Sequence, residues 1–189
     1  MPASTISRPR RKRLWTYDEL IEKKPESNQP SELWDGELVM SPAPKPDHQH
    51  IVLVMAKLLY DFATPRRLGR VFVSPIDVVV SARRAVQPDI VFISRANLGI
   101  IRDQIRGAPD LVVEVISEGT WRRDRIDKKA LYEQYGVKEY WLIDPEAESI
   151  EVYELVDGAY KLRAKAGGEQ EASSRLLPDF KVAFSQLTG

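Results

Sequence analysis

The sequence predicts an α/β fold, and three patterns carry this prediction. Residues 111–116 (LVVEVI) are almost wholly apolar, as expected for a central strand that is covered on both faces. Across residues 51–62, apolar side chains recur at three- and four-residue steps, which is typical of a helix with one buried face. Residues 122–135 then have a helical pattern and residues 139–143 (EYWLI) a strand pattern. The order strand, helix, strand favours a parallel crossover at the core.

Capping and turn residues define the first elements of the chain. Thr16 and Glu19 have the capping-box spacing, which predicts a short helix over residues 17–22. The Asp-Gly pair at 35–36 supplies residues that tolerate positive φ. Because strand-forming residues flank this pair, a hairpin is predicted over residues 31–40.

The remaining segments alternate between strand-forming and turn-forming residues. Val, Ile and Phe are enriched in two segments that a short turn separates, and a second Asp-Gly pair predicts a hairpin near the C-terminus. These segments are strands at 69–81 and 85–93, a polar connection with a helical turn at 96–107, strands at 150–155 and 160–164, and a closing segment at 176–187.

Length and composition are those of one globular domain. The chain has 189 residues, and its 28 Lys plus Arg balance 28 Asp plus Glu, so the formal net charge is zero. No overall positive field therefore indicates nucleic acid, and any such role depends on local basic patches. We expect one domain over residues 14–189. Residues 1–13 are predicted to form a flexible basic arm, because their polar, Arg-rich composition cannot bury apolar surface.

The absence of certain residues and runs excludes several classes of protein. The chain has no cysteine, which removes disulfides, thiolate metal sites and cysteine nucleophiles. No apolar run approaches the roughly 20 residues that cross a bilayer, and the first residues lack an apolar stretch of the signal-peptide type. We therefore expect a cytoplasmic protein without a membrane partner.

Asp89 and Glu114 are the most informative polar residues. Each has apolar strand residues beside it, Asp89 in the segment QPDI and Glu114 inside LVVEVI. An ionised carboxylate in such a place is costly unless a cation or hydrogen bonds compensate its charge. Mg²⁺ prefers oxygen ligands and keeps several waters, so these two carboxylates and a main-chain carbonyl, such as that of Val115, would hold it. The metal could then activate water and stabilise the charge on a phosphodiester.

The same two residues allow a structural interpretation. Asp89 follows Pro88 at a strand entrance that water can reach, and Glu114 could pair with an Arg or Lys at the end of its strand. Ion pairs of this kind also place carboxylates beside apolar residues. Composition alone leaves both interpretations open.

A succession of motifs covers nearly the whole chain, from about residue 15 to residue 185. The motifs are DGEL at 35–38, a proline-rich loop with His48, QPD at 87–89, APDLVVEVIS at 108–117, a D-x-x-x-K-x-x-x-Y helix at Asp124, Lys128 and Tyr132, and GVKEYWLIDP at 136–145. This ordered series resembles the Uma2 family (DUF820) of the PD-(D/E)XK nuclease superfamily. The series as a whole is much more specific than any single motif in it.

The resemblance implies a fold, an activity and a set of site residues. The fold is a restriction-endonuclease-like core, a mixed β-sheet flanked by α-helices, with additional N- and C-terminal hairpins. The activity is Mg²⁺- or Mn²⁺-dependent cleavage of DNA. Asp89 matches the aspartate of the PD motif and Glu114 matches the acidic residue of the third core strand, so both would be metal ligands and catalytic residues.

One position departs from the superfamily pattern. A lysine should stand two residues after the acidic residue, where this chain has Ile116. Lys128 matches a lysine that Uma2-like sequences carry on the following helix, where it would be a catalytic residue that positions water or neutralises charge. The alternative is an i,i+4 ion pair between Asp124 and Lys128 on a solvated face.

Four further residues are weaker candidates that could support the metal ligands or contact phosphate. They are Glu32, His48, Asp124 and Arg125. For Glu32 the alternative is an exposed strand residue, and for His48 it is a surface or packing residue. Arg125 belongs to a basic run after the proposed metal strand, and such a run often forms only a solvated helix face. The aromatic residues Tyr132, Tyr135, Tyr140 and Trp141 have spacings that suit core or dimer packing, and we interpret them as structural.

DNA is the expected partner, and a homodimer is also expected. Exposed edge strands and an aromatic C-terminal hairpin favour self-association, and two sites would suit the cutting of both strands of a duplex. Two alternative functions, which are not those of a nuclease, stay open. One is a nucleic-acid-binding module that has lost catalysis, consistent with the missing in-strand lysine. The other is a structural or regulatory dimer whose acidic residues pair with the following helix.

Overall fold

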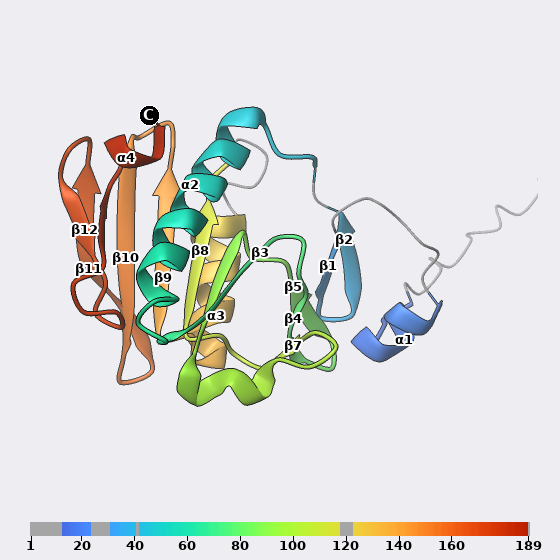
Figure 1. Cartoon of the computed structure of the whole chain (residues 1–189). Helices are drawn as coiled ribbons and strands as arrows, with labels where there is room; N and C mark the ends of the chain where they lie inside the picture. The colour runs from blue at the N-terminus through green and yellow to red at the C-terminus, as the bar shows by residue number, and fades with distance from the viewer. Residues whose placement is uncertain (1–12, 24–30, 41, 118–122, 189) are drawn as a thin grey trace, which may run out of the picture.

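An α/β fold with mixed sheets flanked by helices is confirmed by the computed structural model (Figure 1). The strands form a six-stranded sheet, a five-stranded sheet and a two-stranded sheet. The residues that the structure describes are 13–23, 31–40, 42–117 and 123–188. Most of the predicted basic arm lies outside them, and the arm stays a prediction.

The six-stranded sheet contains the predicted central strand and the predicted crossover. Strands β8 and β9 pair in parallel, and the other neighbours in this sheet are antiparallel. All five residues of β8 are buried, as its apolar sequence predicts. In spatial order the strands are β11 (Ala159–Gly167), β10 (Ser149–Val156), β9 (Glu139–Asp144), β8 (Leu111–Val115), β6 (Ile90–Ser94) and β3 (Gly69–Val73).

The five-stranded sheet contains the predicted N-terminal hairpin, whose turn has positive φ at both Asp35 and Gly36. Helix α1 (Tyr17–Lys23) packs its apolar residues on this sheet, and its first turn has the predicted capping box between Thr16 and Glu19. In spatial order the strands are β2 (Glu37–Met40), β1 (Ser31–Trp34), β5 (Arg84–Val86), β4 (Val78–Ser81) and β7 (Ile105–Arg106).

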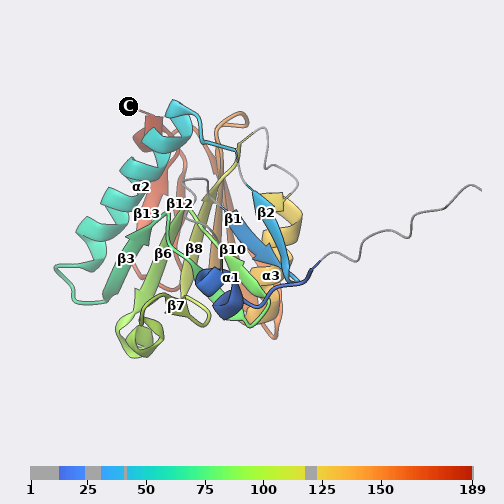
Figure 2. The same ribbon diagram turned by 90° about the vertical axis from the view of Figure 1, so that its right-hand side faces the viewer.

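Helices cover both faces of the six-stranded sheet. On one face, α2 (Pro46–Ala63) packs against the side chains of Val113 and Val115. On the other face, α3 (Lys129–Tyr135) packs against Val112. Figure 2 shows these two helices with the strands between them. The π-helix η2 (Arg123–Lys128) leads directly into α3, which ends at Gly136 with a φ of 83°.

Smaller elements complete the chain. The 3₁₀-helix η1 (Arg95–Ile100) follows β6 and provides the predicted helical turn. The two-stranded sheet pairs β12 (Glu171–Ser173) with β13 (Lys181–Ala183), and α4 (Ser185–Thr188) follows it. Within the described ranges, we find no helix with the length and apolar character that crossing a membrane requires.

Four sequence predictions differ from the observed elements. The strand expected over 69–81 is divided into β3 and β4, and the strand over 85–93 into β5 and β6. Proline lies in each gap, where its lack of an N–H donor prevents continuous pairing. The helix expected over 122–135 begins as a π-helix. His48 lies in the first turn of α2 and not in a loop, because Pro46 starts the helix, a position where proline is tolerated.

Candidate active site

The two carboxylates singled out in the sequence lie at the same end of the neighbouring strands β6 and β8. Ile90 at the start of β6 pairs with Val113 of β8 in an antiparallel register. Asp89 directly precedes β6, and Glu114 is the last residue but one of β8. A hydrogen bond of 2.8 Å from the Val115 N–H to Asp89 Oδ2 ties the two segments together beyond the last strand pair.

Asp89 is more exposed to solvent than Glu114. Its side chain is 16% exposed, and its Oδ2 lies 3.3 Å from Nε2 of His48 in the first turn of α2. The other oxygen, Oδ1, accepts no hydrogen bond from the residues that the structure describes. One oxygen is therefore fixed by the protein, and the other remains able to accept a further contact.

Glu114 is almost completely buried, and two side chains from the next helix contact its carboxylate. Nζ of Lys128 lies 3.0 Å from the carboxylate, and the Tyr132 hydroxyl donates to Oε1 at 2.5 Å. Burial, followed by the adjacent charge of Glu114, raises the pKa of Tyr132 well above its ordinary value. The hydroxyl is therefore protonated and available as a donor.

Lys128 also joins the two larger sheets. Its Nζ lies 3.3 Å from Oε1 of Glu32, a buried residue of β1. Glu32 is itself fixed, because its oxygens accept from the Gln87 N–H at 3.1 Å and from Nε1 of Trp34 at 2.9 Å. The lysine is thus held between a carboxylate of each sheet. Glu32 is not the exposed strand residue that one interpretation of the sequence allowed.

The π-helix explains how a residue so far from β8 in the sequence reaches Glu114. Lys128 is the last residue of η2 and the N-cap of α3, and Tyr132 follows one turn later on the same helix face. π-Helical turns are rare and occur frequently at functional sites. The structure does not describe the side chain of Asp124, so the i,i+4 pair with Lys128 that the sequence left open as an alternative lies outside the described part of the chain.

A pocket of about 500 Å³ opens beside His48. It lies where α2 begins and where the parallel strands β8 and β9 end, the position at which open α/β sheets commonly bind ligands. Its lining residues are Lys45, Asp47 and His48 from the start of α2, Ile116 and Ser117 after β8, and Pro145 and Glu146 after β9. His48, which contacts Asp89, thus connects the carboxylate pair to the pocket.

Arg125 lies in a different cluster of charged residues. Its guanidinium contacts Asp144 at 3.0 Å and Glu151 at 3.1 Å. Glu151 also accepts from the Tyr153 hydroxyl and from Lys165 Nζ. Burial opposes ionisation of Glu151, but these three donors outweigh burial and lower its pKa to about 2. In this structure Arg125 therefore stabilises a carboxylate pair on β9 and β10.

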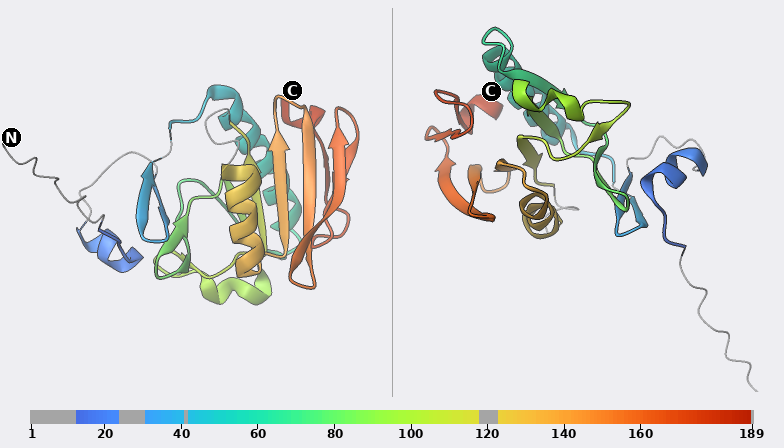
Figure 3. Two further views of the ribbon diagram at one scale, coloured as in Figure 1. Left: turned by 180° about the vertical axis from the view of Figure 1, so that it is seen from behind. Right: turned by 90° about the horizontal axis from the view of Figure 1, so that it is seen from below.

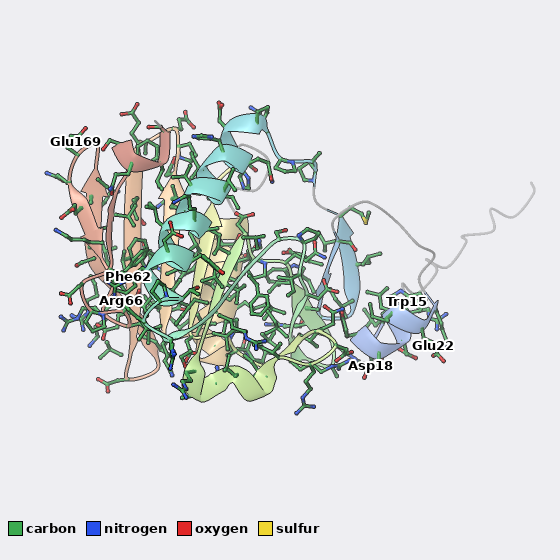
Figure 4. All side chains as sticks on the ribbon, in the orientation of Figure 1. Trp15, Asp18, Glu22, Phe62, Arg66 and Glu169 are labelled. Atoms are coloured by element: carbon green, nitrogen blue, oxygen red, sulfur yellow. The ribbon has the colours of Figure 1, made fainter. Side chains whose placement is uncertain are left out.

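Basic residues at the far end of α2 do not belong to the carboxylate site. Arg66 lies over the Phe62 ring, 4.2 Å from its centroid, at the C-terminal end of the helix (Figure 4). His48 lies in the first turn, about 20 Å away along the helix axis. Phosphate contacts close to Asp89 would have to come from other residues.

The family model Uma2, described as "Putative restriction endonuclease", matches residues 16–185. The chain belongs to the Uma2 family. A similar solved structure is that of "a putative nuclease belonging to DUF820" from Anabaena variabilis, with a TM-score of 0.76 and 18% sequence identity. The match covers 92% of this chain and 97% of the other, and it shows a shared fold. No match was found among curated proteins.

The donors present in this Uma2 chain fit the divalent cation that the resemblance implies. Within the described ranges, no three or more His, Cys, Asp or Glu side chains are grouped to hold a metal. A cation at Asp89 and Glu114 would therefore have no third side chain of these types as a ligand. Mg²⁺ typically takes one or two carboxylates and keeps several waters, so a pair of carboxylates at the edge of a pocket suits it.

Sequence reasoning missed part of this Uma2 site. Tyr132 was interpreted as structural, and its ring is indeed fully buried in the core. Its hydroxyl, however, donates to Glu114. The available signal was its position four residues after Lys128, which places both side chains on one helix face. Nothing in the sequence indicated that Trp34 and Gln87 hold Glu32.

Proposed function

We propose that this Uma2 protein is a Mg²⁺- or Mn²⁺-dependent endonuclease that hydrolyses phosphodiester bonds in DNA. The observation that carries the proposal is that Asp89 and Glu114 lie at the same end of adjacent strands, where Glu114 contacts a buried lysine and Asp89 contacts His48 at the wall of a pocket. The two carboxylates, with the Val115 carbonyl, are the proposed metal ligands. A bound divalent cation would supply an activated water and compensate the charge that develops on the phosphate.

The contacts of Asp89 and Glu114 support different parts of this task. Asp89 Oδ2 is fixed by the Val115 N–H, while Oδ1 has no hydrogen-bond donor among the described residues. Glu114 is buried and held by a helix. Such an arrangement fixes the ligands before a cation binds, which lowers the entropic cost of binding.

Lys128 is the proposed catalytic lysine. Its ammonium lies next to Glu114, and Glu32 holds it from the other side. In this position it can orient a water molecule or stabilise negative charge on the phosphate. Its location on η2 replaces the lysine that the superfamily pattern places within the strand.

His48 and the pocket are proposed to receive the substrate next to the metal ligands. The ring of His48 contacts Asp89 and also lines the pocket. Lys45, at the start of α2, provides a cation at the pocket wall. A phosphate entering here would meet both the lysine and the N-terminus of a long helix, which favour negative charge. Asp124 stays a possible support for this site only as a sequence prediction.

The ion pair between Lys128 and Glu114 also favours one alternative function. A structural or regulatory protein on the same fold would use these residues as a buried ion pair and would bind neither metal nor DNA. The predicted homodimer is compatible with both the nuclease and the structural or regulatory function. Light scattering at micromolar concentration tests whether the protein is a dimer. A monomer would contradict the dimer without affecting the nuclease proposal.

The test compares wild type with an Asp89→Ala, Glu114→Ala double variant. Calorimetric titration with Mg²⁺ and Mn²⁺ is combined with cleavage of plasmid and single-stranded DNA in the same samples. Loss of both binding and cleavage in the double variant is expected. The control is Glu151→Gln, which alters a buried carboxylate of the neighbouring cluster and should keep both properties. A wild-type protein that binds neither metal would contradict the proposal.

A further inference from the structure

The Tyr132 hydroxyl has a partner that core packing does not require. Its ring is fully buried on α3 and lies 5.4 Å from the ring of Tyr140, within the core cluster between α3 and the sheet. A phenylalanine ring would fill the same space. The hydroxyl is directed at Oε1 of Glu114, at 2.5 Å. What the hydroxyl adds is therefore a specific contact to a proposed metal ligand.

Tyr132 and Lys128 hold Glu114 from consecutive turns of one helix. The lysine donates to Oε2 at 3.0 Å and lies equally close to Oε1, and the tyrosine donates to Oε1. A carboxylate held only by a flexible lysine side chain can rotate about its terminal torsion, whereas a second donor on a ring packed in the core restricts that rotation. Figure 3 shows α3 running alongside the strands of the sheet that carries this site. The helix therefore sets the orientation of the carboxylate as well as its charge balance.

We propose that Tyr132 is a positioning residue that fixes the Glu114 carboxylate for a divalent cation. This inference rests on the proposed metal-dependent function. A carboxylate oxygen has two lone pairs, so a hydrogen bond to Oε1 is compatible with metal ligation by the same group. Hydrogen-bond partners of metal ligands orient those ligands, and their removal typically weakens metal affinity or activity about 10- to 100-fold.

The neighbouring charged cluster provides a matched control. The Tyr153 hydroxyl donates at 2.5 Å to Glu151, a buried carboxylate on the same sheet. Tyr153→Phe thus removes the same chemical group from the same kind of partner as Tyr132→Phe does. The two variants differ in whether the carboxylate is a proposed metal ligand.

The experiment measures Mn²⁺ affinity by calorimetry, the single-turnover cleavage rate at saturating Mn²⁺, and thermal stability for wild type and both variants. Tyr132→Phe should bind Mn²⁺ about 10- to 100-fold more weakly than wild type. Tyr153→Phe should stay within about threefold of wild type, inside the scatter of unrelated substitutions. A merely structural role for Tyr132 would lower stability in both variants and leave Mn²⁺ affinity unchanged.

Other results of the same measurements would contradict the proposed role of Tyr132. Unchanged Mn²⁺ affinity in folded Tyr132→Phe overturns it and leaves the proposed function standing. A wild-type protein that neither binds Mn²⁺ nor cleaves DNA overturns both. If Tyr132→Phe does not fold, NMR of ring-labelled wild type decides: saturating Mg²⁺ should shift the Tyr132 signal and not that of Tyr153. A Tyr132 signal that Mg²⁺ leaves in place would overturn the inference.

Discussion

Two buried glutamates in one row of the six-stranded sheet have similar contacts and different surroundings. Leu142 of β9 pairs with Glu114 on one side and with Glu151 on the other, so both glutamates point to the same face. Strand spacing places them about 10 Å apart. Each accepts from a tyrosine hydroxyl at 2.5 Å and lies 3.0 Å from a lysine Nζ. Hydrogen bonding alone does not distinguish them.

The difference lies in the second carboxylate of each cluster. Beside Glu151, both oxygens of Asp144 are occupied, Oδ2 by Arg125 and Oδ1 by the Ala147 N–H. Beside Glu114, Asp89 Oδ1 has no donor among the described residues, and the adjacent His48 lines a pocket. Asp144 thus has no oxygen left for a cation, whereas Asp89 keeps one oxygen that could accept one. We expect this difference to separate residues that act in function from residues that act in stability.

The largest expected effect comes from exchanging each glutamate for its amide. Glu114→Gln should reduce cleavage by more than about 100-fold, because a ligand matters more than the partners that orient it. Glu151→Gln should keep cleavage near the wild-type rate. Single-turnover rates on plasmid DNA at saturating Mg²⁺ provide the measurement. Equal losses in both variants would mean that the two clusters do not differ in function.

The two lysines should differ almost as strongly. Lys128→Met should lower cleavage by about 100-fold or more, the contribution typical of a group that assists proton transfer. Lys165→Met is the control, since Lys165 contacts Glu151 at the same distance. Lys128→Met also leaves two buried carboxylates without their cation, so Mg²⁺ should raise its melting temperature more than that of wild type. A melting temperature insensitive to Mg²⁺ would contradict the proposed metal site.

Acid should destabilise the protein partly through Glu151. Its native pKa is about 2, against an ordinary value of 4.5, so the unfolded chain takes up a proton first as the pH falls. The stabilisation that ionised Glu151 contributes is complete above about pH 4.5 and is lost as the pH approaches 2. A pKa shift of this size corresponds to a contribution of roughly 3 kcal/mol to the free energy of unfolding. Measured by urea unfolding from pH 6 to pH 2.5, the free energy of unfolding should fall less steeply with pH for Glu151→Gln than for wild type. An identical pH dependence in the two proteins would contradict the assignment of this acid sensitivity to Glu151.

The smallest effect is expected for the stability of Lys165→Met. The Lys165 side chain is 59% exposed, and ion pairs of exposed lysines contribute less than about 1 kcal/mol. Arg125 continues to compensate Glu151 in this variant. Urea unfolding at pH 7 measures the change. A loss well above 1 kcal/mol would indicate that Lys165, rather than Arg125, provides most of the compensation.

Local patterns in the sequence determined much of the fold. The apolar run of β8, the Asp-Gly turn of the first hairpin and the capping box of α1 each rest on neighbouring residues, and each is confirmed. The carboxylates of Asp89 and Glu114 were conspicuous for the same reason, since charge beside apolar strand residues needs compensation. Proline divided the longer strands because sheet pairing depends on backbone donors, which composition alone underestimates.

Only the tertiary structure decided which partner each charged residue has. Glu32 reaches Lys128 because two sheets meet there, and Arg125 joins Asp144 and Glu151 because of the rotation of η2 above β9 and β10. The Tyr132 hydroxyl points at Glu114 for the same reason. Contacts between elements distant in the sequence depend on strand register and helix rotation, and whole-core packing sets both. Sequence therefore determined which groups need a partner, and the tertiary structure determined which partner each group has.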